Sequence, residues 1–317
     1  MTAQKKFDIV SFGEPMVEFN QTGENNGLNY LQGFGGDTSN FAIAAARSGA
    51  RVAVIGALGD DPYAKMLRNL WDKERVDHSE MLVDIHAFTA IYFVTHGPRG
   101  HDFNFFRKGS AASCIKPSTL PTSGITNTKF FHLSGISLAI SQSALESAYK
   151  AVELAHQSGA LVSFDTNLRL KLWSIEQARS VMRDFISLCD ICLPSFDDIS
   201  ALTGKVDPDE LVDECLNLGA KTVALKLGDQ GALVADSTKR YRISPHPCEC
   251  KDATGAGDTF GGTFITRLLA QDDLLTAGNY ANVAAALSTQ GYGAVNPIPY
   301  ERDIQLALNQ RVLISKA

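Results

Sequence analysis

Apolar strand-like segments alternate with longer helix-like segments through the second half of this chain, and this alternation most constrains its fold. The strand-like segments are 129–133, 161–165, 189–193 and 222–226, and the helix-like segments are 143–156, 175–188, 208–218, 260–270 and 274–290. Repeated strand–helix units favour a mostly parallel sheet with helices on both faces. The sequence therefore predicts an α/β fold, with segments 232–235 and 240–243 as late antiparallel strands.

The first half of the chain predicts two further strands of the main sheet and a separate hairpin. Segments 7–12 and 51–56 are apolar and of strand length, and residues 14–19 are predicted to continue the first strand. Segments 89–95 and 102–107 are rich in aromatic and β-branched residues, alternate in polarity, and flank a turn at 97–100. This hairpin is expected to belong to a sheet that lies apart from the main α/β core.

Bulk composition excludes several classes of protein. The 317 residues are 44% hydrophobic and 20% charged, as expected for a soluble globular chain with a large core. The formal net charge of −6 argues against a nucleic-acid partner, and no apolar run is long enough to span a membrane. The polar start does not resemble a signal peptide, and the six cysteines show no zinc signature. A cytoplasmic location is therefore expected.

A glycine-rich segment, 252–258, precedes a long apolar run and predicts an anion-binding site. Small residues let backbone N–H groups at a helix start face a phosphate. A carboxylate is unfavourable beside an anion unless it takes part in the reaction, so Asp258 is predicted to take a proton from a hydroxyl that attacks the phosphate. Two alternatives stay open: an ordinary helix start, and a dinucleotide-binding loop, which here lacks a preceding apolar strand.

Other polar residues are predicted to gather at the carboxyl ends of the parallel strands, where open α/β sheets bind ligands. They follow three successive strands: Asn167 and Arg169, then Ser195 and Asp198, then Gly228. A second glycine loop, 33–40, runs into an alanine-rich helix. Asp37 and Asn40 at the start of that helix are interpreted either as helix caps or as groups that bind a polyol.

Two motifs carry a resemblance to a known family. One is Gly35-Gly36-Asp37-Thr38-Ser39-Asn40 with the helix that follows, and the other is Asp252-Ala-Thr-Gly-Ala-Gly-Asp258. Both are similar to signatures of the ribokinase-like, or phosphofructokinase-B, carbohydrate kinases, and the match runs from Gly13 to Gly293. The resemblance implies an ATP-dependent kinase for a sugar hydroxyl that uses Mg²⁺, and it leaves a K⁺ requirement open.

The resemblance also implies an architecture. The expectation is one ribokinase-like domain, 1–317, made of a large α/β part and a small β-sheet lid. The lid is expected to be discontinuous, built from about 14–34 and 88–108. Exposed lid strands have edges that need covering, so a homodimer formed through the lids is expected as well.

Individual residues take roles from the resemblance. Asp258 is the implied catalytic base, and the backbone N–H groups of Gly255, Ala256 and Gly257 form the implied anion hole. The implied nucleotide side comprises Lys226, Gly228, Gly231, Thr254, Asn282 and Ser195, together with Gly255 and Gly257. The implied acceptor side comprises Glu18, Gly36 and Asn40, and Asp37 and Tyr92 are predicted from their own positions to contact the acceptor as well. Where the family often has Asn-x-x-Glu, this chain reads Ser195-Phe-Asp-Asp198, so Asp198 is expected to contact magnesium through water.

The acceptor is inferred from two further segments. Residues 105–113 and 164–173 resemble those of 2-keto-3-deoxygluconate kinases within the family, which implies transfer to the 6-hydroxyl of a six-carbon keto acid. Arg107 and Arg169 suit the carboxylate of such a sugar acid, because a guanidinium binds a carboxylate through two hydrogen bonds. Three alternatives remain: each arginine pairs with a surface acid, the chain is a fructokinase or another neutral-sugar kinase, or it is a sugar-sensing protein without catalysis.

Overall fold

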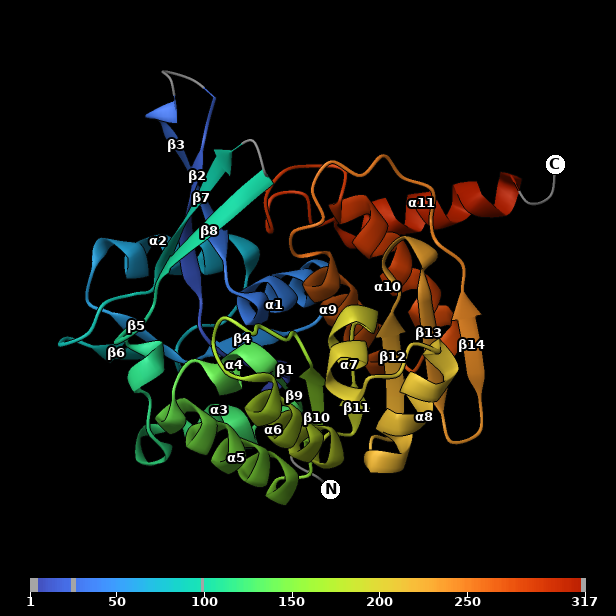
Figure 1. Ribbon diagram of the computed structural model, residues 1–317, viewed down its shortest axis with the longest axis horizontal. Coiled ribbons are helices and arrows are strands. Elements are labelled where there is room, and N and C mark those ends of the chain that lie inside the picture. The colour runs from blue at the N-terminus through green and yellow to red at the C-terminus, as the bar shows by residue number, and fades with distance from the viewer. Residues whose placement is uncertain (1–4, 24–26, 98–99, 315–317) are drawn as a thin grey trace.

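The computed structural model describes residues 5–23, 27–97 and 100–314 of the chain (Figure 1). A large body holds the main sheet and its helices, and a smaller sheet projects from one side of that body (Figure 1). Within these three ranges, no helix has both the length and the apolar character needed to cross a bilayer.

The main sheet has eight strands in the order β14-β13-β12-β11-β10-β9-β1-β4. Their bounds are β1 (Phe7–Phe12), β4 (Val52–Ile55), β9 (Thr128–Ser134), β10 (Leu161–Asp165), β11 (Ile191–Cys192), β12 (Thr222–Lys226), β13 (Ala232–Asp236) and β14 (Arg240–Ile243). The strands from β4 to β12 in this order are parallel, and β13 and β14 are antiparallel additions at one edge. The predicted α/β class and the two late antiparallel strands are confirmed.

Helices cover both faces of this sheet, because successive residues of a buried strand point to opposite sides. In β1, Val10 packs into one hydrophobic cluster and Ile9 into the other. The Val10 face carries α3 (Thr122–Thr126), α4 (Gly135–Ala139), α5 (Gln142–Gln157), α6 (Ile175–Leu188), α7 (Phe196–Thr203) and α8 (Pro208–Leu218). The Ile9 face carries α1 (Asp37–Arg47), α2 (Pro62–Glu74), α9 (Ala256–Leu269) and α10 (Leu274–Ser288), and α11 (Glu301–Ile314) packs on α10.

The smaller sheet has four strands in the order β3-β2-β7-β8. Their bounds are β2 (Met16–Gln21), β3 (Tyr30–Gly35), β7 (Ile91–Gly97) and β8 (Gly100–Phe106). Strands β7 and β8 form the predicted hairpin, and turn residues 98–99 lie outside the described part of the chain. The prediction that 14–19 continues the first strand is wrong. The chain leaves the main sheet after Phe12, and β2 pairs with β7 instead.

Some predicted boundaries differ from the structure for identifiable reasons. Helix α9 begins at Ala256 rather than at residue 260, because Gly255 adopts the left-handed conformation (φ 77°) and turns the glycine-rich segment into the first turn. The predicted strand 189–193 is reduced to β11, and α11 was not predicted. The remaining short elements are β5 (Ala57–Gly59), β6 (Leu82–Asp84) and the 3₁₀ turns η2 (Ala112–Cys114), η3 (Pro117–Thr119) and η4 (Gly228–Gln230).

Candidate active site

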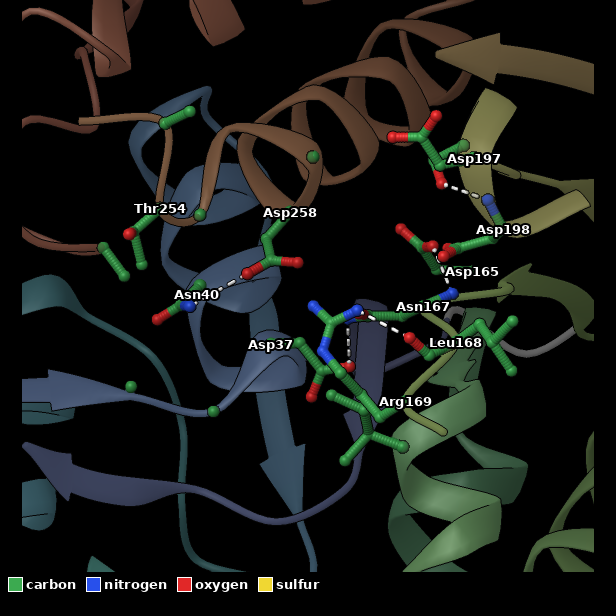
Figure 2. Close-up of a pocket in the computed structure, with 18 of the residues that line it drawn as sticks. Asp37, Asn40, Asp165, Asn167, Leu168, Arg169, Asp197, Asp198, Thr254 and Asp258 are labelled. Carbon is green, nitrogen blue, oxygen red and sulfur yellow. Dashed lines mark hydrogen bonds between the residues drawn. The ribbon is translucent and has the colours of Figure 1, made fainter. Parts of the chain in front are cut away.

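A cleft of about 1150 Å³ lies at the carboxyl ends of the parallel strands. Asp165 at the end of β10 and Lys226 at the end of β12 form part of its wall. Tyr92 and Phe105 line it from the smaller sheet, so both sheets contribute to one cavity. The first turns of α1 and α9 complete the wall and bring the two glycine-rich motifs together (Figure 2).

The start of α9 is built to leave backbone donors free. No side chain caps the helix, and in the described part of the chain the N–H groups of Gly257 and Asp258 donate to no backbone oxygen. Gly255 has no room for a side chain, because a Cβ there would lie 2.9 Å from Ala294 O. Thr254 holds the preceding turn, since its N and Oγ1 donate to Asp252 Oδ1 at 2.9 and 2.6 Å. Free donors at a helix N-terminus favour a phosphate.

Asp258 lies in that first turn and faces the cleft (Figure 2). Asn40 Nδ2 donates to Asp258 Oδ2 at 2.9 Å across the gap between α1 and α9. Burial first, and then the charge of Asp37, raise the pKa of Asp258 to about 7, while the Asn40 bond opposes the rise. A carboxyl group with a pKa near neutrality is suited to accept a proton from an attacking hydroxyl.

The start of α1 presents polar oxygens to the same space. Asp37 Oδ2 accepts a 2.8 Å hydrogen bond from Asn167 Nδ2, but Asp37 Oδ1 and Asn40 Oδ1 are buried without a partner among the described residues. Neither residue caps α1, which has no side-chain cap, so the helix-cap interpretation is wrong. Gly36 (φ 94°) lets the chain enter this turn, because a Cβ there would lie 2.5 Å from Glu14 O. Unpartnered acceptors in a cleft suit a polyhydroxylated ligand.

Lys226 supplies a cation beside the free N–H groups. Its Nζ lies 2.5 Å from Asp165 Oδ2, and this ion pair is largely shielded from solvent. A Cβ built on Gly257 would lie 3.4 Å from the same Nζ, so the ammonium group is next to the first turn of α9. Burial raises the pKa of Asp165, and the charge of Lys226 opposes that rise.

Carboxylates suited to a hydrated magnesium ion line the adjoining wall. Ser195 caps α7 by accepting a 3.2 Å hydrogen bond from Asp198 N, which fixes the start of that helix. Asp198 Oδ2 accepts a 3.2 Å bond from Thr166 Oγ1 and borders the cleft. The described residues hold no group of three or more acidic, histidine or cysteine side chains able to bind a metal directly. The donor set fits a hydrated magnesium ion, which Asp198 would hold through water.

The two predicted arginines have different surroundings. Arg107 Nη2 donates to Glu14 Oε2, an acid that is buried rather than on the surface. Burial raises the pKa of Glu14, and Arg107 and Ser110 oppose the rise. Arg169 is exposed, and its recorded bond is from Nη1 to Leu168 O at 2.8 Å. It lines the same cleft as Asp37 and Asp258 (Figure 2).

Most of the predicted site residues border this one cleft. They are Gly36, Asp37, Asn40, Tyr92, Arg107, Arg169, Ser195, Asp198, Lys226, Gly228, Thr254, Gly255, Gly257 and Asp258. Four others lie outside the lining: Glu18, Gly231, Ala256 and Asn282.

Local hydrogen bonds account for the residues outside the lining. Glu18 lies behind Tyr92, whose hydroxyl donates to Glu18 Oε2 at 2.5 Å, and Asn282 Nδ2 donates to Ser244 O at 3.0 Å. The N–H of Ala256 was predicted to form part of the anion hole. The tight turn directs it to Ala253 O instead, at 3.2 Å. Gly231 (φ 88°) ends the 3₁₀ turn η4.

Glu14 and Asp165 are among the acids of the lining that the sequence did not single out. Each stands at or just beyond the end of a buried strand, at the edge of the sheet where ligands bind. An acid in that position is the signal that could have identified them.

The fold and the site together define a class. A mostly parallel sheet, a helix start with free N–H donors, and a carboxyl group of raised pKa beside unpartnered polar acceptors suit the transfer of a phosphoryl group to a hydroxyl. The family model for pfkB family carbohydrate kinases matches residues 6–301, and this chain belongs to that family. It is an ATP-dependent sugar phosphotransferase, so the dinucleotide-binding and non-catalytic alternatives are set aside.

Curated relatives span nearly the full chain. "Probable fructokinase-4" of Arabidopsis thaliana is 33% identical over 315 residues, which cover 95% of this chain and 96% of that protein. The 2-dehydro-3-deoxygluconokinase of Thermoproteus tenax is 32% identical over 312 residues, covering 96% and 94%. The two identities are too close to decide between a neutral sugar and a sugar acid.

Solved structures agree on the fold. The Vibrio cholerae O395 fructokinase bound to fructose, ADP and calcium superposes with a TM-score of 0.85 at 29% identity, covering 95% of this chain and 98% of that one. An E. coli protein assigned as a ribokinase II, in complex with ATP and Mg²⁺, superposes with a TM-score of 0.88 at 25% identity, covering 96% and 99%.

Proposed function

We propose that this kinase transfers the γ-phosphoryl group of ATP to the 6-hydroxyl of 2-keto-3-deoxygluconate, giving 2-keto-3-deoxy-6-phosphogluconate. The observation that carries the proposal is the position of Arg169. Arg169 lines the same cleft as Asp37 and Asp258, and within the described chain its guanidinium forms no ion pair with an acid (Figure 2). A cation that lines the cleft without a carboxylate partner suits the carboxylate of a sugar acid.

The chemistry follows from the groups around Asp258. Asp258 accepts the proton of the 6-hydroxyl while the oxygen of that hydroxyl forms the new bond to the γ-phosphorus. The bond from this phosphorus to the ADP oxygen breaks. The N–H groups of Gly257 and Asp258 and the ammonium of Lys226 stabilise the negative charge on the transferred oxygens. Bound magnesium would neutralise the phosphate oxygens of ATP, and Asp198 is the residue proposed to hold it through water. Thr254, Gly228 and Ser195 border the proposed nucleotide side of the cleft.

A neutral ketohexose such as fructose is the second candidate, and one observation favours it. Arg107 is already paired with the buried carboxylate of Glu14, so it does not act as a free cation for an acidic substrate. Relatives named as fructokinases are as similar to this chain as the 2-dehydro-3-deoxygluconokinase.

A coupled ADP-release assay with both acceptors separates these candidates. The keto acid should give the higher kcat/KM, and strong fructose turnover without keto-acid turnover would refute the proposal. Arg169→Leu should raise KM for the keto acid by about tenfold or more, the loss expected for a charged hydrogen bond, with little effect on fructose. Lys171→Leu removes a neighbouring charge from the cleft wall and should leave the preference between acceptors unchanged.

We also propose that the smaller sheet acts as a lid and that two copies of the chain associate through it. Tyr92, Phe105 and Arg107 reach the cleft from the smaller sheet and its end, which supports a covering role. Leu31 on β3 and Phe106 on β8, the two edge strands of that sheet, are exposed apolar residues. Sedimentation of the wild type against a Leu31→Lys, Phe106→Lys variant tests the association, and a wild type that sediments as a monomer would refute it.

A further inference from the structure

A buried ion pair joins two of the stretches of chain that connect the main body to the smaller sheet. Glu14 lies between β1 and β2, and Arg107 directly follows β8. Arg107 Nη2 donates to Glu14 Oε2, and Ser110 Oγ donates to Glu14 Oε1 at 2.7 Å. The Glu14 side chain is fully shielded from solvent, and that of Arg107 is 12% exposed. Both oxygens of Glu14 therefore face donors from the second connection.

This pairing changes what Arg107 offers to a ligand. Arg107 borders the cleft, and its buried Nε has no hydrogen-bond partner in the described part of the chain. Charges at contact distance and away from water interact strongly, so the Glu14 carboxylate offsets the positive charge of the guanidinium. Its buried Nε–H is left as a donor, and an N–H of a guanidinium whose charge is offset suits a hydroxyl or carbonyl oxygen better than a second carboxylate.

We propose that Glu14 is a specificity-determining residue of the acceptor site. By pairing with Arg107, it reserves that guanidinium for an uncharged oxygen of the acceptor and leaves the recognition of a carboxylate to Arg169. The role of Arg169 in this division rests on the function proposed above, whereas the effect of Glu14 on Arg107 does not. The two arginines differ accordingly: Arg107 is partly buried and paired with Glu14, whereas Arg169 is exposed and forms no ion pair with an acid among the described residues.

Glu14→Gln tests the proposal, because glutamine keeps the size of the side chain and removes its charge. The probe is gluconate, a six-carbon sugar acid, measured as a competitive inhibitor against whichever sugar the enzyme phosphorylates. The freed charge on Arg107 should lower the inhibition constant of gluconate by about tenfold, while the constant of the neutral sugar fructose, measured as a substrate or as a competitive inhibitor, changes by less than about twofold. If both constants move by the same factor, Glu14 has a structural role only and the proposal is wrong.

A double variant keeps the test decisive if Glu14→Gln folds poorly. Glu14→Gln with Arg107→Gln replaces the ion pair with two neutral amides, so the ratio of the two constants should stay near that of the wild type. A selective loss of gluconate binding would show that Arg107 acts as a free cation, which would overturn the proposal.

Glu74→Gln is the matched control. It breaks a second buried arginine–glutamate pair, in which Arg47 Nε lies 2.8 Å from Glu74 Oε2 and the side chains are 7% and 2% exposed. Neither residue borders the cleft, so this variant should lower the unfolding temperature without changing the ratio of the gluconate constant to the neutral-sugar constant.

The test of Glu14 can be distinguished from the test of the proposed function. A wild type that phosphorylates fructose and not the keto acid would refute the function proposed above, yet competition by gluconate would still test Glu14.

Discussion

Asn40 Nδ2 donates a 2.9 Å hydrogen bond to Asp258 Oδ2, which joins the first turns of two helices from distant parts of the chain. Helices α1 and α9 approach this closely because α9 presents glycine to its neighbour. A Cβ on Gly262 would lie 2.3 Å from Phe41 O, so no larger residue fits there without a shift. Close packing of small residues therefore fixes the position of the proposed base relative to the acceptor pocket.

Asp258→Asn should lower kcat by roughly 10²–10⁴-fold, because it removes the proposed base while keeping the shape of the side chain. Binding of the sugar should change little, since the amide can still bond with Asn40. Steady-state kinetics together with calorimetric titration of the sugar checks both expectations. A variant that kept most of its turnover would show that Asp258 is not the base.

The activity should fall on the acid side of neutrality. Asp258 must be ionised to accept a proton, and its pKa of about 7 places the acid limb of the kcat/KM profile near that pH. Asn40→Ala removes a bond that favours the charged form, so the limb should move to higher pH. A profile that is flat down to about pH 5 in the wild type would contradict this assignment.

Stability should follow pH in the opposite sense to activity. The folded-state pKa of Asp258 is raised above the ordinary value of 3.8, so the folded chain binds the extra proton between about pH 4 and pH 7. The unfolding free energy then decreases as pH rises through this window, by at most about 1.4 kcal/mol per unit. Urea unfolding should show Asp258→Asn gaining stability over the wild type at about pH 8 and not at about pH 4. An equal difference at the two pH values would refute the prediction.

Lys226→Met should lower both stability and turnover. The substitution leaves the buried carboxylate of Asp165 without its cation, a change that costs on the order of 3–5 kcal/mol. Adding Asp165→Asn removes the unpaired charge and should restore much of the stability, as measured by denaturant unfolding. Turnover should stay about a hundredfold low in the double variant, because the cation beside α9 is still missing. Recovery of kcat would show that Lys226 is structural.

Gly255→Ala should raise KM for ATP, whereas a glycine substitution with similar backbone strain elsewhere should not. A side chain at Gly255 faces a positive φ and would also lie 2.9 Å from Ala294 O, so the first turn of α9 must move. Gly204→Ala is the control, since Gly204 has a similar φ of 78° at the end of α7 and open space around its Cβ. Both variants should lose about 1 kcal/mol of stability from backbone strain. Equal KM values for ATP in the two variants would count against an anion site at α9.

The elements of the main sheet were predictable because their signals are local. Strands β10 and β12 and helices α6 and α8 have the predicted bounds, since each carries its own apolar periodicity over a few turns or residues. The helix start at the glycine-rich motif before Asp258 was predictable for the same reason, because the free N–H donors of a helix start lie within one helical turn.

The sequence by itself thus determined the α/β class, the glycine-rich helix start that is proposed to receive the phosphate, and the carboxylate of Asp258 beside it. Tertiary structure alone decided which charges are paired. Glu14 pairs with Arg107 and Asp165 pairs with Lys226, whereas Arg169 pairs with no acid of the described chain. It also decided that the chain leaves the main sheet after Phe12. The physical reason is that periodicity reports which face of an element is buried, whereas an ion pair depends on distances between elements that lie far apart in the sequence.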